Sequence, residues 1–135
     1  GPRAAELLAA FERFEADDSL AVAILHGAGG TFCAGADLTS VGDESWRPQV
    51  DPDGHGPMGP SRMALSKPLI AAVEGFAFGG GFECVLACDL VVAARDARFG
   101  APEVKRGVVA NTGALFRAGV RLPFNVATGL AQSLT

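Results

Sequence analysis

The sequence predicts an α/β fold in which short strands and helices alternate along the chain. Apolar runs of strand length lie at 20–26, 67–75 and 89–94. Segments of helical type lie at 3–16 and 81–88, before and between these runs. Strands and helices that alternate at short intervals favour a parallel sheet with right-handed crossover connections.

The first predicted element is an amphipathic helix at 3–16. Its apolar residues recur at helical spacing and are Leu7, Leu8, Phe11 and Phe14. Polar residues fill the other side, so the helix has one face to bury. The run LAVAILH at 20–26 is unbroken and apolar. Such a run predicts a strand that is buried on both faces of a parallel sheet.

The segment at about 39–62 is of a different kind. It contains four prolines and four glycines and has no hydrophobic period. It is predicted to be a long irregular loop, and loops of that length are usually functional or disordered. Trp46 and His55 lie in it. A lone histidine in such a loop is predicted to be solvated, with a catalytic role as the less favoured alternative.

The second half contains the remaining elements. KPLIAAVEG at 67–75 predicts a strand that begins at a proline, and FAFGGG at 76–81 predicts a turn. The helix at 81–88 is apolar nearly all round and is expected to be buried. DLVVAA predicts a third strand, and RDARFGAPEV predicts a turn, a short strand and a new element with Pro102 in its first turn. Residues 111–135 are mostly of helical type, interrupted by RLP.

Composition limits the class of protein. A chain of 135 residues corresponds to about one domain, taken here as 1–135, and it can bury a core. Its 49% hydrophobic and 19% charged residues indicate a globular protein. The net charge of −4 without a Lys/Arg cluster argues against nucleic-acid binding. No apolar run is long enough for a membrane span and no secretory signal is recognised, so we expect no membrane association and a cytoplasmic location.

The three cysteines are predicted to be reduced. Cys33, Cys84 and Cys88 are an odd number at spacings unsuited to a disulfide framework. Cys84 and Cys88 are four residues apart and would share a helix face. A metal site needs further ligands, and the chain has only two histidines, His26 and His55. We therefore expect buried thiols and no metal.

The glycines at 79–81 lie between a predicted strand and a buried helix. Glycine admits backbone angles that other residues avoid, and the start of the helix presents unpaired N–H groups. Such a site can stabilise an oxyanion. Close packing of helix against strand explains the glycines equally well. The stretch CAGAD at 33–37 is a second glycine-centred turn that follows a predicted strand, and it could supply a second N–H group.

Two acidic residues lie near these turns. Glu83 is in the first turn of the buried helix, and Glu103 follows GAP. A carboxyl group in apolar surroundings has a raised pKa, which suits acid–base catalysis near neutral pH. Taken singly, each glutamate is explained better as a helix N-terminal charge or a capping partner.

In combination these residues resemble a known family. TFCAGADL, KPLIAAVEGFAFGGGFECVLACDLVVAARDARFGAPEV and KRGVV are similar to the crotonase superfamily, the enoyl-CoA hydratase/isomerase group. The resemblance covers nearly the whole chain. It implies a spiral of ββα units, a homotrimer or hexamer, and an acyl-CoA thioester as substrate. No separate cofactor is implied, because coenzyme A is part of the substrate.

The resemblance also implies roles for particular residues. The N–H groups of Ala36 and Gly80 would bind the thioester oxygen as an oxyanion hole. Glu83 would help to activate a water molecule, and Glu103 would give a proton to the α-carbon of a 2-enoyl thioester. The residues expected to contact substrate or coenzyme A are Ala34, Ala36, Asp37, Leu38, Thr39, Gly80 and Gly81.

The match has departures, and they leave alternatives open. Ala110 and Leu115 stand where the family commonly has proline and threonine, in a region that shapes the acyl pocket. Relative to the family, the chain is expected to be truncated at both ends. Hydration is favoured because both glutamates are present, and fatty-acid β-oxidation is its expected setting. Isomerisation of Δ3- to Δ2-enoyl-CoA needs only one carboxylate, and a non-catalytic acyl-CoA-binding paralogue is the third hypothesis.

Overall fold

The computed structural model describes residues 2–36, 55, 59, 61–107, 109–110 and 112–132. Its elements follow the sequence in this order: α1 (Pro2–Ala16), β1 (Ala23–His26), β2 (Leu69–Val73), β3 (Phe76–Phe78), α2 (Gly80–Ala87), β4 (Leu90–Ala93), β5 (Arg98–Gly100), the 3₁₀-helix η3 (Pro102–Arg106), α3 (Ala114–Arg121) and α4 (Phe124–Gln132). The predicted helices at 3–16 and 81–88 are confirmed within one residue at each end, and Pro102 begins η3.

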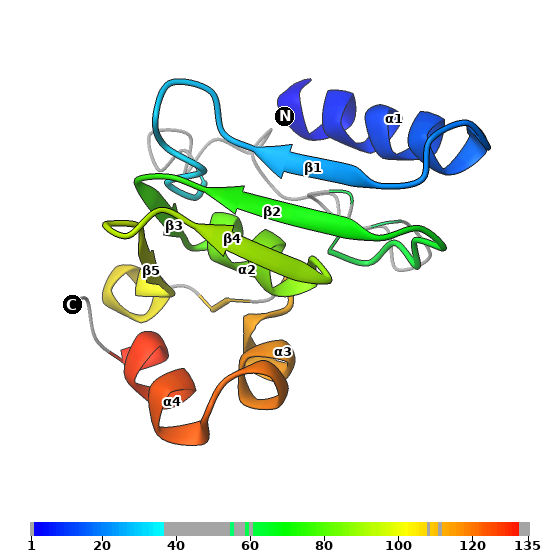
Figure 1. The fold of residues 1–135 in the computed structure, drawn as a ribbon. Coiled ribbons are helices and arrows are strands. Elements are labelled where there is room, and N and C mark those ends of the chain that lie inside the picture. Colours follow the sequence, from blue (N-terminus) through cyan, green and yellow to red (C-terminus); the bar gives the residue numbers. More distant parts are fainter. Residues whose placement is uncertain are drawn as a thin grey trace.

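The strands form two parallel sheets. One has the order β1-β2-β4, and the other consists of β3 and β5. β2 and β3 contribute one strand to each sheet and then lead into α2, and β4 and β5 do the same before η3 (Figure 1). The expected spiral of ββα units is confirmed. Phe76–Phe78 is a strand and not the predicted turn, because these residues pair with β5.

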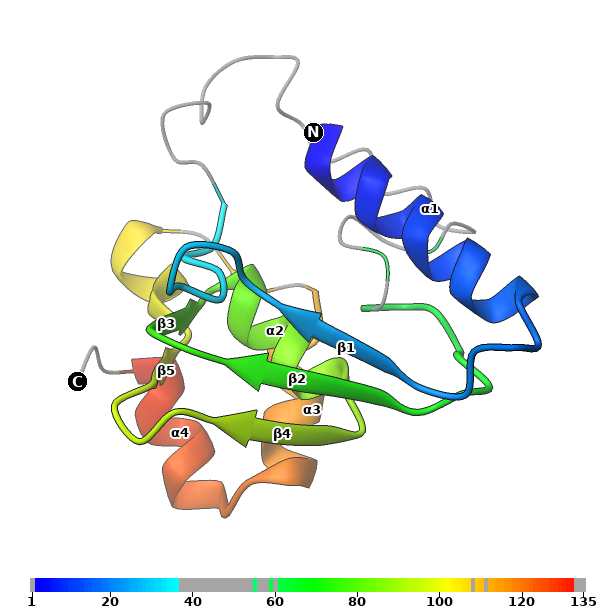
Figure 2. The same cartoon turned by 45° about the horizontal axis from the view of Figure 1, so that its top comes forward.

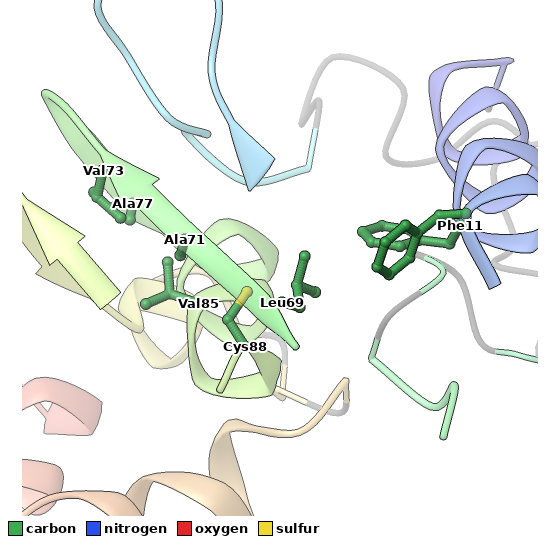
Figure 3. Close-up of a cluster of buried hydrophobic side chains, with 8 residues drawn as sticks. Phe11, Leu69, Ala71, Val73, Ala77, Val85 and Cys88 are labelled. Carbon is green, nitrogen blue, oxygen red and sulfur yellow. The ribbon is translucent and has the colours of Figure 1, made fainter. Parts of the chain in front are cut away.

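The main core lies between the three-stranded sheet and α2. Alternate residues of β2 point to this side, and Leu69, Ala71 and Val73 are buried there against Val85 and Cys88 (Figure 3). The amphipathic α1 lies beside β1, and its two phenylalanines join the same core (Figure 2). On the far side of α2, α3 and α4 pack around a second cluster that includes Phe82 and Leu86.

The prediction that the first strand is buried on both faces is wrong. Ile24 of β1 is 63% exposed, and its neighbours across the sheet continue an open row through Ile70 to Leu90, which is 61% exposed. All four residues of β4 are exposed as well. Among the described residues, helices cover only one face of this sheet. The apolar composition of a strand therefore does not show whether both of its faces are buried.

No helix within the described ranges is both long and apolar enough to cross a membrane.

Candidate active site

The two glycine-centred turns lie side by side. Cys33 forms a parallel bridge with Ala77, in which the Cys33 N–H donates to the Phe76 carbonyl at 2.9 Å and the Phe78 N–H donates to the Cys33 carbonyl at 2.9 Å. Immediately beyond this bridge, a Cβ atom placed on Gly35 would lie 3.7 Å from Gly79 Cα. The structure therefore brings the turn that contains Ala34 and Ala36 against the start of α2.

The start of α2 has the geometry expected from its glycines. Gly79 is the N-cap residue with φ 56° and ψ −127°, a conformation that favours glycine, and it provides no side-chain cap. Gly80 and Gly81 form the first turn, where helical N–H groups lack intrahelical partners. Gly81 packs directly on Cys33, where a Cβ atom would overlap the Cys33 backbone. Close packing and N–H groups without intrahelical partners therefore coexist at this tract.

Glu83 is held by a segment far along the chain. Its side chain is only 2% exposed, and Oε1 accepts hydrogen bonds from the N–H groups of Thr112 at 2.9 Å and Ala114 at 3.0 Å. Its carboxyl group thus bonds to the turn before α3. The reading of Glu83 as a mere helix N-terminal charge does not account for these two bonds.

Glu103 lies across the same turn. A Cβ atom on Gly79 would be 3.4 Å from Glu103 Oε1 and 3.6 Å from Gly35 Cα, so this carboxyl group and the Gly35 turn both border Gly79. Its other oxygen, Oε2, is buried and has no hydrogen-bond partner in the described part of the chain. Burial raises the pKa of Glu103 above the ordinary 4.5, a backbone hydrogen bond within the residue opposes this, and the charge of Glu83 raises it further. The charge of Glu83 therefore acts on the carboxyl group of Glu103.

The remaining predicted residues have mixed outcomes. Asp37, Leu38 and Thr39, expected to contact coenzyme A, lie outside the described residues, as does Trp46. His55 is exposed, as expected of a solvated histidine.

The cysteines are free thiols. Cys84 and Cys88 are buried, and Cys33 is half-buried. Burial raises the pKa of Cys84 to about 12 and that of Cys88 to about 11, so both thiols stay protonated. Within the described residues no group of three or more His, Cys, Asp or Glu side chains is arranged to hold a metal ion.

The sequence reasoning missed the turn at 112–114. Its backbone N–H groups hold Glu83, and any residue type except proline supplies such a group. The sole local signal is Gly113, which has φ 145° and precedes α3. That glycine marks a turn but does not indicate what the turn binds.

Comparison with known proteins identifies the family. The family model described as enoyl-CoA hydratase/isomerase matches residues 3–134. The chain belongs to the enoyl-CoA hydratase/isomerase family. Its crotonase fold is shared with an enoyl-CoA hydratase from Mycobacterium tuberculosis, whose structure superposes with a TM-score of 0.85 at 47% identity, over 96% of this chain and 50% of that one.

Two curated relatives carry more specific names. A mevalonyl-coenzyme A hydratase of Aspergillus fumigatus is 46% identical over 114 residues, which are 84% of this chain and 42% of the relative. A carnitinyl-CoA dehydratase of Proteus mirabilis is 44% identical over 115 residues, which are 84% of this chain and 44% of the relative. The chain thus spans less than half the length of the curated relatives it matches.

In this protein, a hollow of about 420 Å³ adjoins the candidate active site at Glu103. Glu103 and Phe82 line it, together with residues of α3 and α4. Half of the other lining residues are alanines, namely Ala101, Ala110, Ala114, Ala118, Ala127 and Ala131. Both departures from the family pattern, Ala110 and Leu115, line this hollow.

Proposed function

We propose that the protein is an enoyl-CoA hydratase that adds water across the double bond of a 2-enoyl-CoA thioester. The observation that carries the proposal is the meeting of Gly35, Gly79 and Glu103 beside α2, the helix that contains Glu83. The family membership, and relatives named as hydratases and a dehydratase, support the same class of reaction.

The proposed oxyanion hole consists of the N–H groups of Ala36 and Gly80. They donate to the thioester oxygen, on which negative charge develops as water adds to the double bond. Preorganised donors of this kind act in a water-poor site, and the loss of one costs roughly 3 kcal/mol of barrier. The contact of Gly35 with Gly79 supports a common target for both donors.

Glu83 acts as the base in this proposal. Its carboxylate takes one proton from water as the water oxygen forms a bond to the β-carbon. The π electrons of the double bond move to form the enolate, whose charge lies on the thioester oxygen. The two backbone hydrogen bonds to Oε1 fix the orientation of the carboxylate. We expect its second oxygen to face the water.

Glu103 acts as the acid. It gives a proton to the α-carbon, which returns the enolate to a thioester and leaves Glu103 as a carboxylate. Its raised pKa supports this role because the protonated form persists to higher pH than in a solvated glutamate. Proton exchange between the two carboxyl groups and solvent restores the starting state.

The test follows the loss of enoyl-thioester absorbance when the full-length protein is mixed with crotonyl-CoA. We expect turnover by the wild type and a loss of about 10²- to 10⁴-fold in each of Glu83→Gln and Glu103→Gln. Wild-type inactivity toward both this substrate and a 3-enoyl-CoA, with retained acyl-CoA binding, would favour the non-catalytic paralogue.

Isomerisation of a 3-enoyl-CoA is the second candidate function, and the surroundings of Glu103 support it. Glu103 has a raised pKa and a buried oxygen that lacks a partner among the described residues, so it could shuttle a proton by itself. Conversion of a 3-enoyl-CoA with full retention in Glu83→Gln would identify an isomerase. If Glu83→Gln loses both the conversion of 3-enoyl-CoA and the hydration of crotonyl-CoA, isomerisation is excluded as the main activity.

We propose that the acyl group occupies the hollow beside Glu103. Gly119 lines this hollow, and a Cβ atom there would meet nothing within 4 Å. Gly129 of α4 is equally open but does not line the hollow. Gly119→Leu should reduce kcat/KM for a ten-carbon enoyl-CoA about tenfold more than for crotonyl-CoA. Gly129→Leu is the matched control and should not discriminate. An equal effect of both variants on both substrates would place the acyl group elsewhere.

We also propose that the protein works in fatty-acid β-oxidation in the cytoplasm.

We further propose that the protein forms a trimer-based assembly. Large apolar side chains are exposed on η3, α3 and α4, namely Val104, Leu115, Phe116, Val120 and Phe124, and three of these, Val104, Leu115 and Phe124, also line the hollow. Contiguous apolar patches usually mark surfaces that another chain covers. Light scattering of the full-length protein should give the mass of a trimer or hexamer, and a monomer would contradict this assembly.

A further inference from the structure

The side chain of Arg117, on α3, links the turn at 112–114 to a distant segment. Its Nη2 donates to the Ser61 carbonyl at 2.7 Å, and its Nη1 donates to the Thr112 carbonyl at 3.4 Å. Ser61 is completely buried and Thr112 nearly so. One guanidinium therefore bridges two buried carbonyl groups from separate parts of the chain.

The guanidinium also packs on the backbone of this turn. A Cβ atom on Gly113 would overlap Arg117 Nη1, so the absence of a side chain at Gly113 makes room for the arginine. The backbone N–H of Arg117 donates to the Gly113 carbonyl at 2.9 Å and closes the first turn of α3. Gly113 itself lies between Thr112 and Ala114, the two residues whose N–H groups hold Glu83.

We propose that Arg117 is a positioning residue for Glu83, which holds the turn at 112–114 so that both N–H groups converge on Oε1. The inference rests on the proposed role of Glu83 and extends it to a residue that touches neither the carboxylate nor the expected substrate position. Arginine suits the task because its charge is permanent and its planar fork donates in fixed directions. Without it, two buried carbonyl groups lose a donor, and the turn is free to relax.

The charge of Arg117 acts on α2 as well. Burial is the main cause of the raised pKa of Cys84, which directly follows Glu83, and the Arg117 guanidinium opposes that increase. The positive charge thus reaches the helix that carries Glu83.

Arg121 provides a matched control on the same helix. It lies one turn further along α3 and donates from Nη1 to the carbonyl of Cys88, at the end of α2. It therefore makes the same kind of contact, from guanidinium to backbone carbonyl, but away from the turn at 112–114. A loss of general docking between α2 and α3 should affect both arginines alike.

The experiment compares Arg117→Gln with Arg121→Gln in the full-length protein. Crotonyl-CoA hydration should show kcat lowered about 10- to 100-fold in Arg117→Gln, because a small misplacement of a catalytic group is costly. KM should stay within about twofold, since substrate binding is not altered. Amide hydrogen exchange at Thr112 and Ala114 should be about tenfold faster in Arg117→Gln than in the wild type. Arg121→Gln should match the wild type in kcat and in exchange at both amides.

Arg117→Lys separates charge from geometry and serves if the glutamine variant does not fold. Lysine keeps the charge but lacks the planar fork, so we expect kcat between those of the wild type and Arg117→Gln. Equal effects of the two arginines on kcat, or unchanged exchange at 112 and 114 in both Arg117 variants, would overturn the proposal. If the wild type does not hydrate crotonyl-CoA, the proposed function fails, while the exchange data still decide whether Arg117 holds the turn.

Discussion

Around Glu83 the protein supplies two backbone N–H groups to one carboxyl oxygen, whereas around Glu103 it supplies burial and, within the described residues, no partner for Oε2. The first carboxyl group is oriented by hydrogen bonds. The second has its pKa raised, mainly by removal from water. Two identical side chains on either side of Gly79 thus have different chemical properties because of their surroundings.

This difference shows how a small site can contain both a base and an acid. A carboxylate with fixed donors keeps its orientation, and a desolvated carboxyl group tends to keep its proton. The donors for Glu83 come from the turn before α3, and the position of Glu103 comes from η3. Separate segments therefore set the surroundings of the two groups.

Apart from the loss of either glutamate itself, the largest expected effect comes from Gly79→Ala, which alters the turn next to Glu103. Alanine is strained at φ 56°, and its Cβ atom would lie in van der Waals contact with Glu103 Oε1 at 3.4 Å, so relief of the strain would displace that carboxyl group. We expect kcat/KM for crotonyl-CoA to fall about 100-fold, as for other small misplacements of catalytic groups. Steady-state kinetics of the full-length protein measure this.

Gly107→Ala is the control for backbone strain. Gly107 follows η3 with φ 69°, and a Cβ atom there would meet nothing within 4 Å. Gly107→Ala should lose about 1 kcal/mol of stability from its left-handed conformation. Gly79→Ala should lose more, about 1–3 kcal/mol, because φ 56° with ψ −127° lies outside the left-handed helical region. If Gly107→Ala lost as much activity as Gly79→Ala, strain and not the displacement of Glu103 would explain the effect.

The part of the site on α2 was predictable from the sequence. A glycine tract before an apolar run indicates a tight strand-to-helix connection, and Glu83 falls in the first turn of that helix whatever surrounds it. Pro102 likewise predicted a helical start next to Glu103. These are local properties of the chain, set by residues only a few positions apart.

The environments of the two glutamates were not predictable in the same way. The bonds to Glu83 come from N–H groups that every residue except proline has, so residue types at 112–114 carry no signal. The exposure of β1 and β4 depends on which sheet face the described helices cover, and an apolar run does not report that. Long-range packing decides these features.

A smaller effect should appear in stability, with opposite signs at the two glutamates. Glu83→Gln removes the charge that strengthens two hydrogen bonds, and the free energy of unfolding should fall by about 1–3 kcal/mol. Glu103→Gln should raise it at pH 7, because a raised pKa means that folding disfavours the charged form. Below the ordinary pKa of 4.5 the gain should vanish, since Glu103 is then protonated in both states. Urea denaturation at pH 7 and pH 4 measures both variants, and destabilisation of the same size by Glu103→Gln at both pH values would contradict this account.

The smallest expected effect is on the pH dependence of hydration. If protonated Glu103 is the acid, activity should fall as pH rises through its pKa, which lies above 4.5. The charge of Glu83 contributes to that increase, so in Glu83→Gln the pKa of Glu103 should move down. It should nevertheless stay above 4.5, because burial is the larger cause and is unchanged. Titration of the Glu103 carboxyl carbon by NMR in the full-length protein follows this shift even where residual activity is too low to measure. An upward or absent shift in Glu83→Gln would mean that the two carboxyl groups do not share one site, and the division into base and acid would fail.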